Sequence, residues 1–222
     1  MQSVRLDQLI PSVQDKLPAT PLRGQVIRSL REAAQTFCFE TEIWKEPLAA
    51  VDVVSGQVVY DLSTTWQAEI RRIHSVCLKT AADITAGRLG DPRDCSLDTY
   101  TPATGEYRFF SAPSTSNIEG GLAFTCVLVP NLQTDELPQW IIGLYGMAFV
   151  FASIADLCSH KGAGPLYDEK TADKYARKYE KMKSNAMAEV FRQNMNASPA
   201  IQPQYNLAGA FNSIGSGYRV GG

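Results

Sequence analysis

Apolar residues recur at helical spacing near the start of the chain. Six of them fall at intervals of three or four: Val26, Ile27, Leu30, Ala33, Ala34 and Phe37. This spacing is typical of a helix with one face toward a core. Thr20 and Pro21 suit the N-cap and the first helical position. We therefore predict a helix over residues 20–38, preceded by a short N-terminal segment, residues 1–19.

The pattern changes toward alternation after Trp44. Residues 48–54 and 57–62 are rich in β-branched side chains and are separated by Ser55 and Gly56, which predicts a hairpin. Further strands are expected at residues 70–78, 106–110 and 122–129, the last two joined across Gly120 and Gly121. The whole β region covers about residues 47–130. Within it, residues 80–105 contain few large apolar side chains and are expected to form a long loop.

Two helices are expected to follow the β region. Asp135, Glu136 and Pro138 favour a helix start, so we predict a helix over residues 136–160. Its stretch from 140 to 155 is uncharged and apolar on every side, as in a helix surrounded by protein. A second, amphipathic helix is predicted over residues 167–193. Its basic excess is modest, and we interpret it as a solvated face.

The composition changes again in the last segment, residues 196–222. It is rich in Asn, Ser, Gly, Pro and Gln, and its only charged side chain is Arg219. Apolar anchors are nevertheless spaced along it. We predict an extended C-terminal arm that becomes ordered on a partner, with a flexible tail as the alternative. The candidate partner-binding residues are Ile201, Tyr205, Leu207, Phe211, Ile214 and Tyr218.

Overall charge and cysteine content exclude few functions, but they argue against non-specific DNA binding, a disulfide framework and a metal site. The 222 residues carry 21 Lys and Arg against 23 Asp and Glu, a net charge of -2, which disfavours non-specific DNA binding. The five cysteines are widely spaced, form no CxxC pair and accompany only two histidines. We therefore expect reduced thiols, no disulfide framework and no metal site. His74 is expected to be a half-exposed strand residue.

Two other functional classes remain open. A membrane-associated protein would use residues 140–158 as its membrane helix, although a spanning helix needs about 20 apolar residues and this run is shorter. No nucleotide-binding, metalloprotease or nucleophile-elbow motif is present. An enzyme would therefore have to use the acidic loop residues Asp91, Asp94 and Asp98, which have no histidine nearby in the sequence.

The order of several motifs resembles that of head-to-tail connector (adaptor) proteins of tailed bacteriophages. The run AQTFCFETEIW at residues 34–44 is similar to the exit of their first helix. VVYDL at 58–62 resembles the following strand. Residues 122–130 followed by ELPQW at 136–140 are similar to their last strand and the start of the long helix. GPLY at 164–167 through RKYE at 177–180 resembles their inter-helix turn and final helix.

This resemblance covers about residues 20–195 and implies a structural virion protein rather than an enzyme. Family members form rings, typically of twelve subunits, that join the portal to the tail and extend the DNA channel. It implies the portal, tail nozzle or tail-tube proteins and further copies of the chain as partners. DNA would pass through the lumen without sequence-specific binding, and no cofactor or membrane is implied. The protein would assemble in the host cytoplasm and reside at the head–tail interface of the virion.

From the sequence we therefore expect a mainly α fold with a β insertion. The helices, about four in number, would form an antiparallel bundle carrying a small antiparallel β element, an adaptor domain over residues 20–195 and the extended arm. Trp44, Trp140 and Phe151 are the expected centre of the core.

Overall fold

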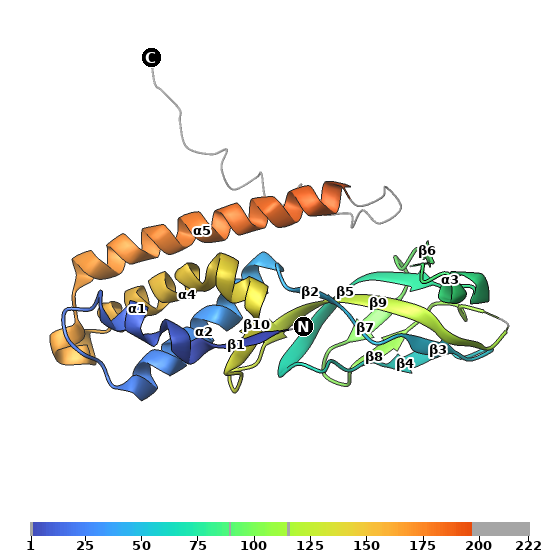
Figure 1. Ribbon diagram of the computed structural model, residues 1–222, viewed down its shortest axis with the longest axis horizontal. Helices are drawn as coiled ribbons and strands as arrows, with labels where there is room; N and C mark the ends of the chain where they lie inside the picture. Colours follow the sequence, from blue (N-terminus) through green and yellow to red (C-terminus); the bar gives the residue numbers. More distant parts are fainter. Residues whose placement is uncertain (1, 89, 115, 197–222) are drawn as a thin grey trace, which may run out of the picture.

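The computed structural model describes residues 2–88, 90–114 and 116–196, which form two lobes along one long axis (Figure 1). We call residues 2–44 and 131–196 the helical lobe, and residues 45–130 the sheet lobe. The predicted partner-binding residues of the C-terminal arm all lie outside the described residues.

The first long helix, α2 (Arg23–Thr41), lies in the middle of the helical lobe. Its buried face includes Val26, Leu30 and Phe37, as the spacing predicted. The predicted start at Thr20 and Pro21 is wrong. Leu22 is extended and serves as the N-cap, and its N–H donates to the side-chain oxygen of Gln25 at 3.2 Å.

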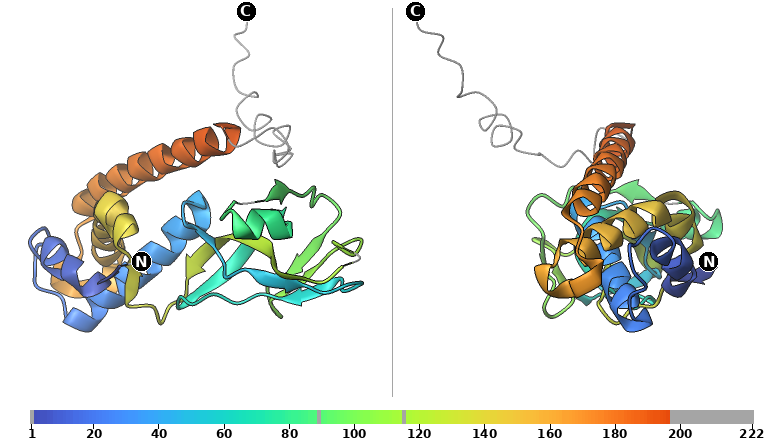
Figure 2. Two further views of the ribbon diagram at one scale, coloured as in Figure 1. Left: turned by 45° about the vertical axis from the view of Figure 1, so that its right-hand side comes forward. Right: turned by 90° about the vertical axis from the view of Figure 1, so that its left-hand side faces the viewer.

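The helices α4 (Gln139–Ser159) and α5 (Glu169–Asn196) run antiparallel, as Figure 2 shows. The Tyr145 hydroxyl donates to Glu189 at 2.8 Å, whereas Phe151, farther along α4, packs on Tyr175 near the start of α5. A short 3-10 helix, η2 (Lys161–Leu166), connects them. The predicted helix at 167–193 is thus confirmed with slightly later bounds.

The predicted helix start at Asp135 and Glu136 is wrong. These residues lead into a strand, β10 (Glu136–Pro138), which pairs antiparallel with β1 (Ser3–Arg5). Pro138 disfavours a helical conformation at the preceding Leu137, so the helix begins only at Gln139. After β1 the chain continues through η1 (Leu6–Leu9) and the short helix α1 (Ile10–Gln14), which contact α4.

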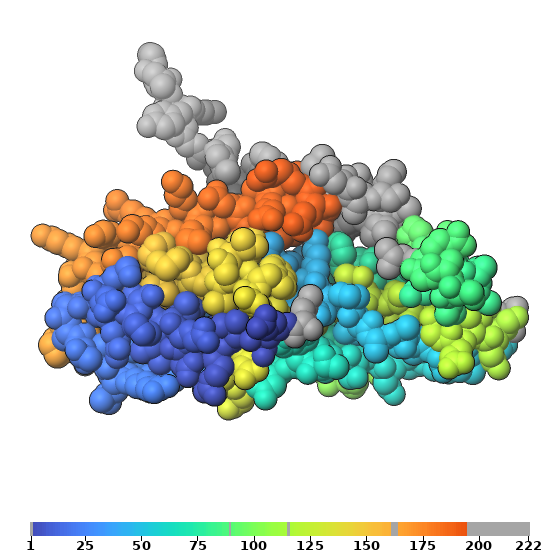
Figure 3. All heavy atoms as spheres, in the orientation of Figure 1, coloured from blue at the N-terminus to red at the C-terminus, as the bar shows by residue number. Residues whose placement is uncertain are grey.

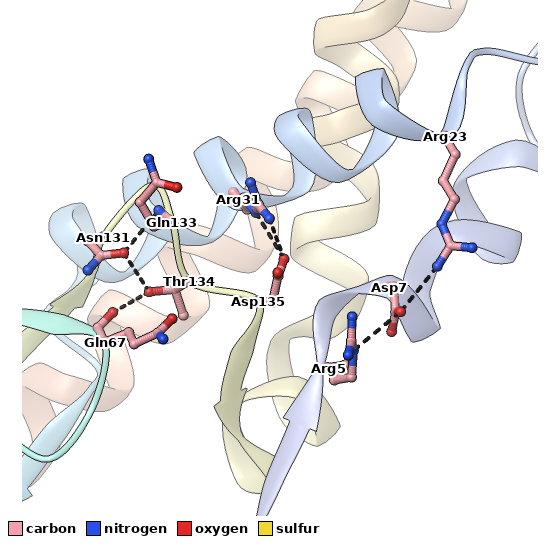
Figure 4. A network of polar contacts seen from close by, with 9 residues as sticks. All are labelled: Arg5, Asp7, Arg23, Arg31, Gln67, Asn131, Gln133, Thr134 and Asp135. Atoms are coloured by element: carbon pink, nitrogen blue, oxygen red, sulfur yellow. Dashed lines mark hydrogen bonds and ion pairs between the residues drawn. The ribbon is translucent and has the colours of Figure 1, made fainter.

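Polar contacts fix the strand–helix junction of the helical lobe (Figure 4). Arg31 of α2 contacts the Asp135 carboxylate at 2.6 Å. Next to it, the Thr134 hydroxyl donates to the backbone oxygen of Gln67 in the sheet lobe and contacts Asn131 at 3.0 Å. Asp7 pairs with Arg23 at 3.3 Å. The contacts of Asp135 and Thr134 hold the chain as it returns from the sheet lobe to α4, and the Asp7–Arg23 pair holds η1 against the start of α2.

The larger sheet of the sheet lobe is built around one long strand, β9 (Ile118–Pro130). Three strands pair antiparallel with β9: β2 (Lys45–Pro47), β3 (Val51–Val53) and β5 (Ala68–Leu78). A two-residue strand, β6 (Asp91–Pro92), extends the sheet beyond β5. The predicted strands at 70–78 and 122–129 are confirmed. Gly120 and Gly121 lie inside β9 rather than between two strands, so the predicted connection is wrong.

A second sheet contains β4 (Val59–Asp61), β8 (Glu106–Arg108) and β7 (Thr99–Thr101). Its aromatic side chains pack on the larger sheet, with Tyr107 edge-on to Phe124 at 5.2 Å between ring centroids. The predicted hairpin is wrong, because β3 pairs with β9 and β4 pairs with β8. The predicted loop at 80–105 holds a short helix, α3 (Ala81–Thr85), as well as β6 and β7.

The predicted helix bundle with a small β element is therefore wrong. The described residues form a sheet-rich α+β fold with five α-helices, two of them only five residues long, and three antiparallel sheets. Strands of three residues are too short to show an alternating pattern, and their partners are distant in sequence. These two properties explain why sequence periodicity underestimated the β content.

The core extends through both lobes. Trp44, at the point where they meet, is fully buried and packs edge-on to Trp66, with 5.6 Å between ring centroids. Trp140 and Phe151, also expected in the core, are only partly buried at its margin. The expected centre is thus correct for Trp44 and wrong for the other two.

Candidate assembly surfaces

The structure does not bring the three predicted acidic residues together. Asp98 is used internally: its carboxylate accepts from the Tyr107 hydroxyl and from the Phe110 N–H, both at 2.8 Å. Asp94 accepts the Ser96 N–H at 2.9 Å, which lowers its pKa. Asp91 lies in β6. Among the described residues, no group of three or more His, Cys, Asp or Glu side chains is arranged to hold a metal ion.

The cysteines are free thiols, as the sequence predicted. Cys38 is buried in α2, and burial raises the pKa of its thiol to about 12. Burial likewise raises the pKa of Cys95 to about 11 and that of Cys126 to about 12. A thiol with a raised pKa is a poor nucleophile at neutral pH, so these side chains fill space in the fold.

An apolar strip of α4 is exposed on the surface of the helical lobe. It consists of Trp140, Gly143, Leu144 and Met147, and we call it the α4 ridge. Leu144 is 62% exposed and Met147 is 41% exposed, while Trp140 is partly buried. Figure 3 shows atoms of α4, in yellow, at the surface between the blue N-terminal segment and the orange α5. No charged residue occurs between positions 137 and 155.

The length and composition of α4 would also allow it to cross a membrane. Half of its most apolar stretch is buried inside the protein, however. Phe149 packs edge-on to Phe37 of α2 at 5.5 Å, and Ser29 of α2 donates to Asp156 at 2.8 Å. The helix thus has a buried face, as expected for a core helix, and an exposed apolar face. Because both faces are apolar, sequence periodicity could not show which of them is exposed.

A row of basic residues on α5 borders the α4 ridge. Spacing places Lys174, Lys178, Lys181 and Arg192 along one exposed strip, which we call the α5 basic stripe. Phe151 continues the ridge by one helical turn beyond Met147, and the Lys178 ammonium lies 5.3 Å from the centre of its ring. The apolar and the basic strips are therefore neighbours.

A charged cluster occupies the joint between the lobes. We call Glu42, Lys45, Arg71, Arg72 and His74 the joint cluster. Both Arg71 and His74 lie at positions where the register between β5 and β9 shifts, so they are the extra residues of two β-bulges. Burial, together with Lys45 and Arg72, lowers the pKa of His74 to about 4.

The sequence alone did not identify the α4 ridge, the α5 basic stripe or the joint cluster as surfaces. For the α4 ridge, the available signal was a glycine at 143 within an apolar helix, although the same helix has a second, buried glycine at 146. The joint cluster had no local signal, since its members are brought together by strand pairing and by the end of α2. His74 was correctly expected as a half-exposed strand residue.

No family model matches the chain, and no curated protein shows significant similarity to it.

Proposed function

We propose that this protein is a structural head-to-tail adaptor of a tailed bacteriophage. In this function, copies of the chain form a ring beneath the portal vertex, join the capsid to the tail and extend the channel for DNA. The proposal combines the order of sequence motifs over residues 20–195 with the surfaces described above. The ring would belong to the virion, contact portal and tail nozzle or tail-tube proteins, and need neither an enzymatic site nor a cofactor.

The single observation that carries the proposal is the α4 ridge. Leu144 and Met147 are exposed on a helix whose opposite face is buried in the core. Contiguous apolar surface of this kind marks an interaction site, because its exposure to water is unfavourable. A subunit buried by its neighbours in a ring would use such a surface. A near-neutral chain also suits a channel through which DNA must move without tight phosphate contacts.

The C-terminal arm, residues 196–222, supplies the second element of the proposal. Its six candidate anchors are separated by small or polar residues, and Arg219 is its only charged side chain. A segment of this composition fits an uncharged groove or sheet edge on the portal or a neighbouring subunit. Replacing Tyr205, Leu207 and Phe211 by serine should therefore weaken portal binding, whereas replacing Gln202, Gln204 and Asn212 by serine should not.

Mass photometry of the full chain, alone and mixed with the cognate portal, tests the proposed function. We expect either a ring-sized species or a complex that forms only with the portal. A chain that stays monomeric and does not bind the portal would contradict the adaptor function. If the serine variant of the three arm anchors binds the portal like the wild type, the arm is not the contact.

Membrane association is the competing function, because α4 is long and apolar enough to span a bilayer. It predicts that the full chain floats with lipid vesicles and needs detergent for extraction. The adaptor proposal predicts recovery in the aqueous fraction without detergent. Replacing Leu144 by aspartate should abolish flotation if the α4 ridge is the membrane contact.

A further inference from the structure

Gly143 occupies an exposed position in the second turn of α4 with open space beside it. Apart from its chain neighbours and the adjacent helix backbone, a Cβ atom built there would meet no atom within 4 Å in the described structure. Glycine weakens a helix relative to alanine, and no close contact within the chain explains its presence. On the α4 ridge it forms a notch beside Leu144 and Met147. A notch flanked by apolar side chains suits a side chain inserted from another molecule.

A second exposed apolar feature lies on the sheet lobe. Leu97 is 66% exposed and Phe110 is 74% exposed, and we call this pair the sheet knob. Asp98 follows Leu97 in sequence and accepts the Phe110 N–H at 2.8 Å, so one side chain holds the two backbones together. The Asp98 carboxylate is itself fixed by the Tyr107 hydroxyl. The knob is therefore pre-organised, which lowers the entropic cost of binding.

The segments that carry these two features differ in charge. Residues 160–196 carry eight Lys and Arg against five Asp and Glu, whereas residues 45–130 carry seven against ten. Beside the α4 ridge runs the α5 basic stripe. Close in sequence to the sheet knob are Asp91 and Asp94, both exposed and without an ion pair to any described residue. Arg93, between them, uses its guanidinium within the chain, where it donates to the backbone oxygen of Ser111 at 3.0 Å.

We propose that the sheet knob of one copy of this chain inserts over Gly143 on the α4 ridge of the next copy. In this contact Asp91 and Asp94 would face the α5 basic stripe while the sheet knob meets the apolar α4 ridge. The two features lie on different lobes (Figure 1), and a contact between two different patches is heterologous. Repeated heterologous contacts generate a closed ring or an open filament.

This inference deepens the proposed function and rests on its ring assembly, for which it names the two surfaces. A second copy is favoured over a membrane because the same chain carries exposed apolar side chains and exposed carboxylates to match the apolar and the basic strips. A membrane would match the basic and apolar strips, but it would leave the pre-organised sheet knob unexplained.

Sedimentation velocity of the full chain over a range of concentrations tests the notch. Gly143→Leu should weaken self-association about tenfold or more, since a leucine side chain fills the space that receives the knob. Phe110→Ser should have the same effect from the other side. Gly24→Leu is the matched control, because Gly24 also lies in a helix with open space beside it. Circular dichroism should confirm that each variant is folded.

Charge reversal tests the pairing of the two surfaces. Lys174→Glu with Lys181→Glu, or Asp91→Lys with Asp94→Lys, should each weaken self-association about tenfold. An equimolar mixture of the two double variants should restore it, because each reversed surface then finds a partner of opposite charge. Lys16→Glu, a charge reversal in the exposed turn after α1, should leave self-association unchanged.

The outcomes separate this inference from the proposed function. If rings form but none of these variants weakens them, or if the mixture does not restore association, the proposed surfaces are wrong while the adaptor function stands. A chain that remains monomeric with and without the portal overturns both. Flotation with anionic vesicles that Leu144→Asp abolishes would assign the α4 ridge to lipid and overturn the contact between copies.

Discussion

The carboxylate of Glu42 forms a two-point ion pair with the guanidinium of Arg72 across the joint between the two lobes. Arg72 Nε donates to Glu42 Oε1 at 3.0 Å, and Arg72 Nη2 donates to Glu42 Oε2. Glu42 is the residue directly after α2, and Arg72 lies on β5 in the sheet lobe. Among the described residues, Glu42 is also the one non-glycine residue with a positive φ, 53°. One ion pair thus joins the end of a helix to a sheet.

Glu42→Gln should lower the free energy of unfolding by about 1–3 kcal/mol. The glutamine keeps the size of the side chain but removes the negative charge, and this leaves Arg71 and Arg72 in a partly buried site without that carboxylate. Urea denaturation measures the change. Glu42→Gly also removes the ion pair but suits the left-handed backbone, so it should cost less than the glutamine variant. Equal stability of Glu42→Gln and wild type would contradict the role of the ion pair.

His74 should make stability depend on pH between about 6.5 and 4. The pKa of His74 falls from 6.5 to about 4 in the folded protein, because burial and the charges of Lys45 and Arg72 disfavour the imidazolium, although Glu42 opposes this. Below pH 6.5 the unfolded chain therefore binds a proton that the folded chain does not, and unfolding becomes easier as the pH falls. The loss levels off below about pH 4.

The effect should amount to about 1 kcal/mol, since His74 is only partly buried and solvent screens its interactions. Urea denaturation at pH 7.5 and pH 5 should show a smaller difference for His74→Gln than for the wild type. His160→Gln is the control, because His160 is exposed at the end of α4. A wild-type difference that His74→Gln leaves intact would have to come from other groups.

Trp44→Ala should destabilise the protein by about 3–5 kcal/mol, the usual cost of removing a fully buried aromatic side chain. The variant also loses the edge-on contact between Trp44 and Trp66 and the hydrogen bond from the Trp44 indole to Glu46, which is 3.2 Å long. Trp140→Ala should cost clearly less, because Trp140 is partly exposed on the α4 ridge. Thermal unfolding of the two variants side by side would test this order, and a larger loss for Trp140→Ala would place it in the core.

The three long helices α2, α4 and α5 could be predicted because each contains enough residues to show a period, unlike the five-residue helices α1 and α3. The apolar stripe of α5, with Tyr175, Ala186 and Val190 buried, follows directly from spacing. The strand partners could not be predicted in this way. Val51 pairs with Leu122 and Tyr60 pairs with Tyr107, contacts between residues far apart in the chain that no local pattern specifies.

For the candidate surfaces, too, the sequence indicated some features, whereas others depend on how the elements pack. The uncharged run from residue 140 onward indicated an unusual helix, but its even apolarity hid which face would remain exposed. Exposure of Leu144 and Met147 is decided by where α2, α5 and η1 pack. Leu97 is a single large apolar residue in a polar part of the sequence, whereas Phe110 follows Phe109 at the end of the predicted strand 106–110, and their pairing depends on the Asp98 side chain. The arm residues predicted as partner contacts remain a prediction.

Gly143→Ala should stabilise the isolated chain by about 0.5–1 kcal/mol. Its Cβ would enter open space, and alanine loses less backbone entropy than glycine when the helix forms. Gly146→Ala, three residues later on the same helix, is the matched comparison. There a Cβ would lie 3.4 Å from Leu9 and 3.5 Å from Ile142, which is ordinary van der Waals contact, so a gain of similar size is expected without packing strain. Urea denaturation below the concentration of self-association measures both variants. A loss of stability in Gly143→Ala would mean that the chain itself needs the notch, and the notch would then give no reason to invoke a partner.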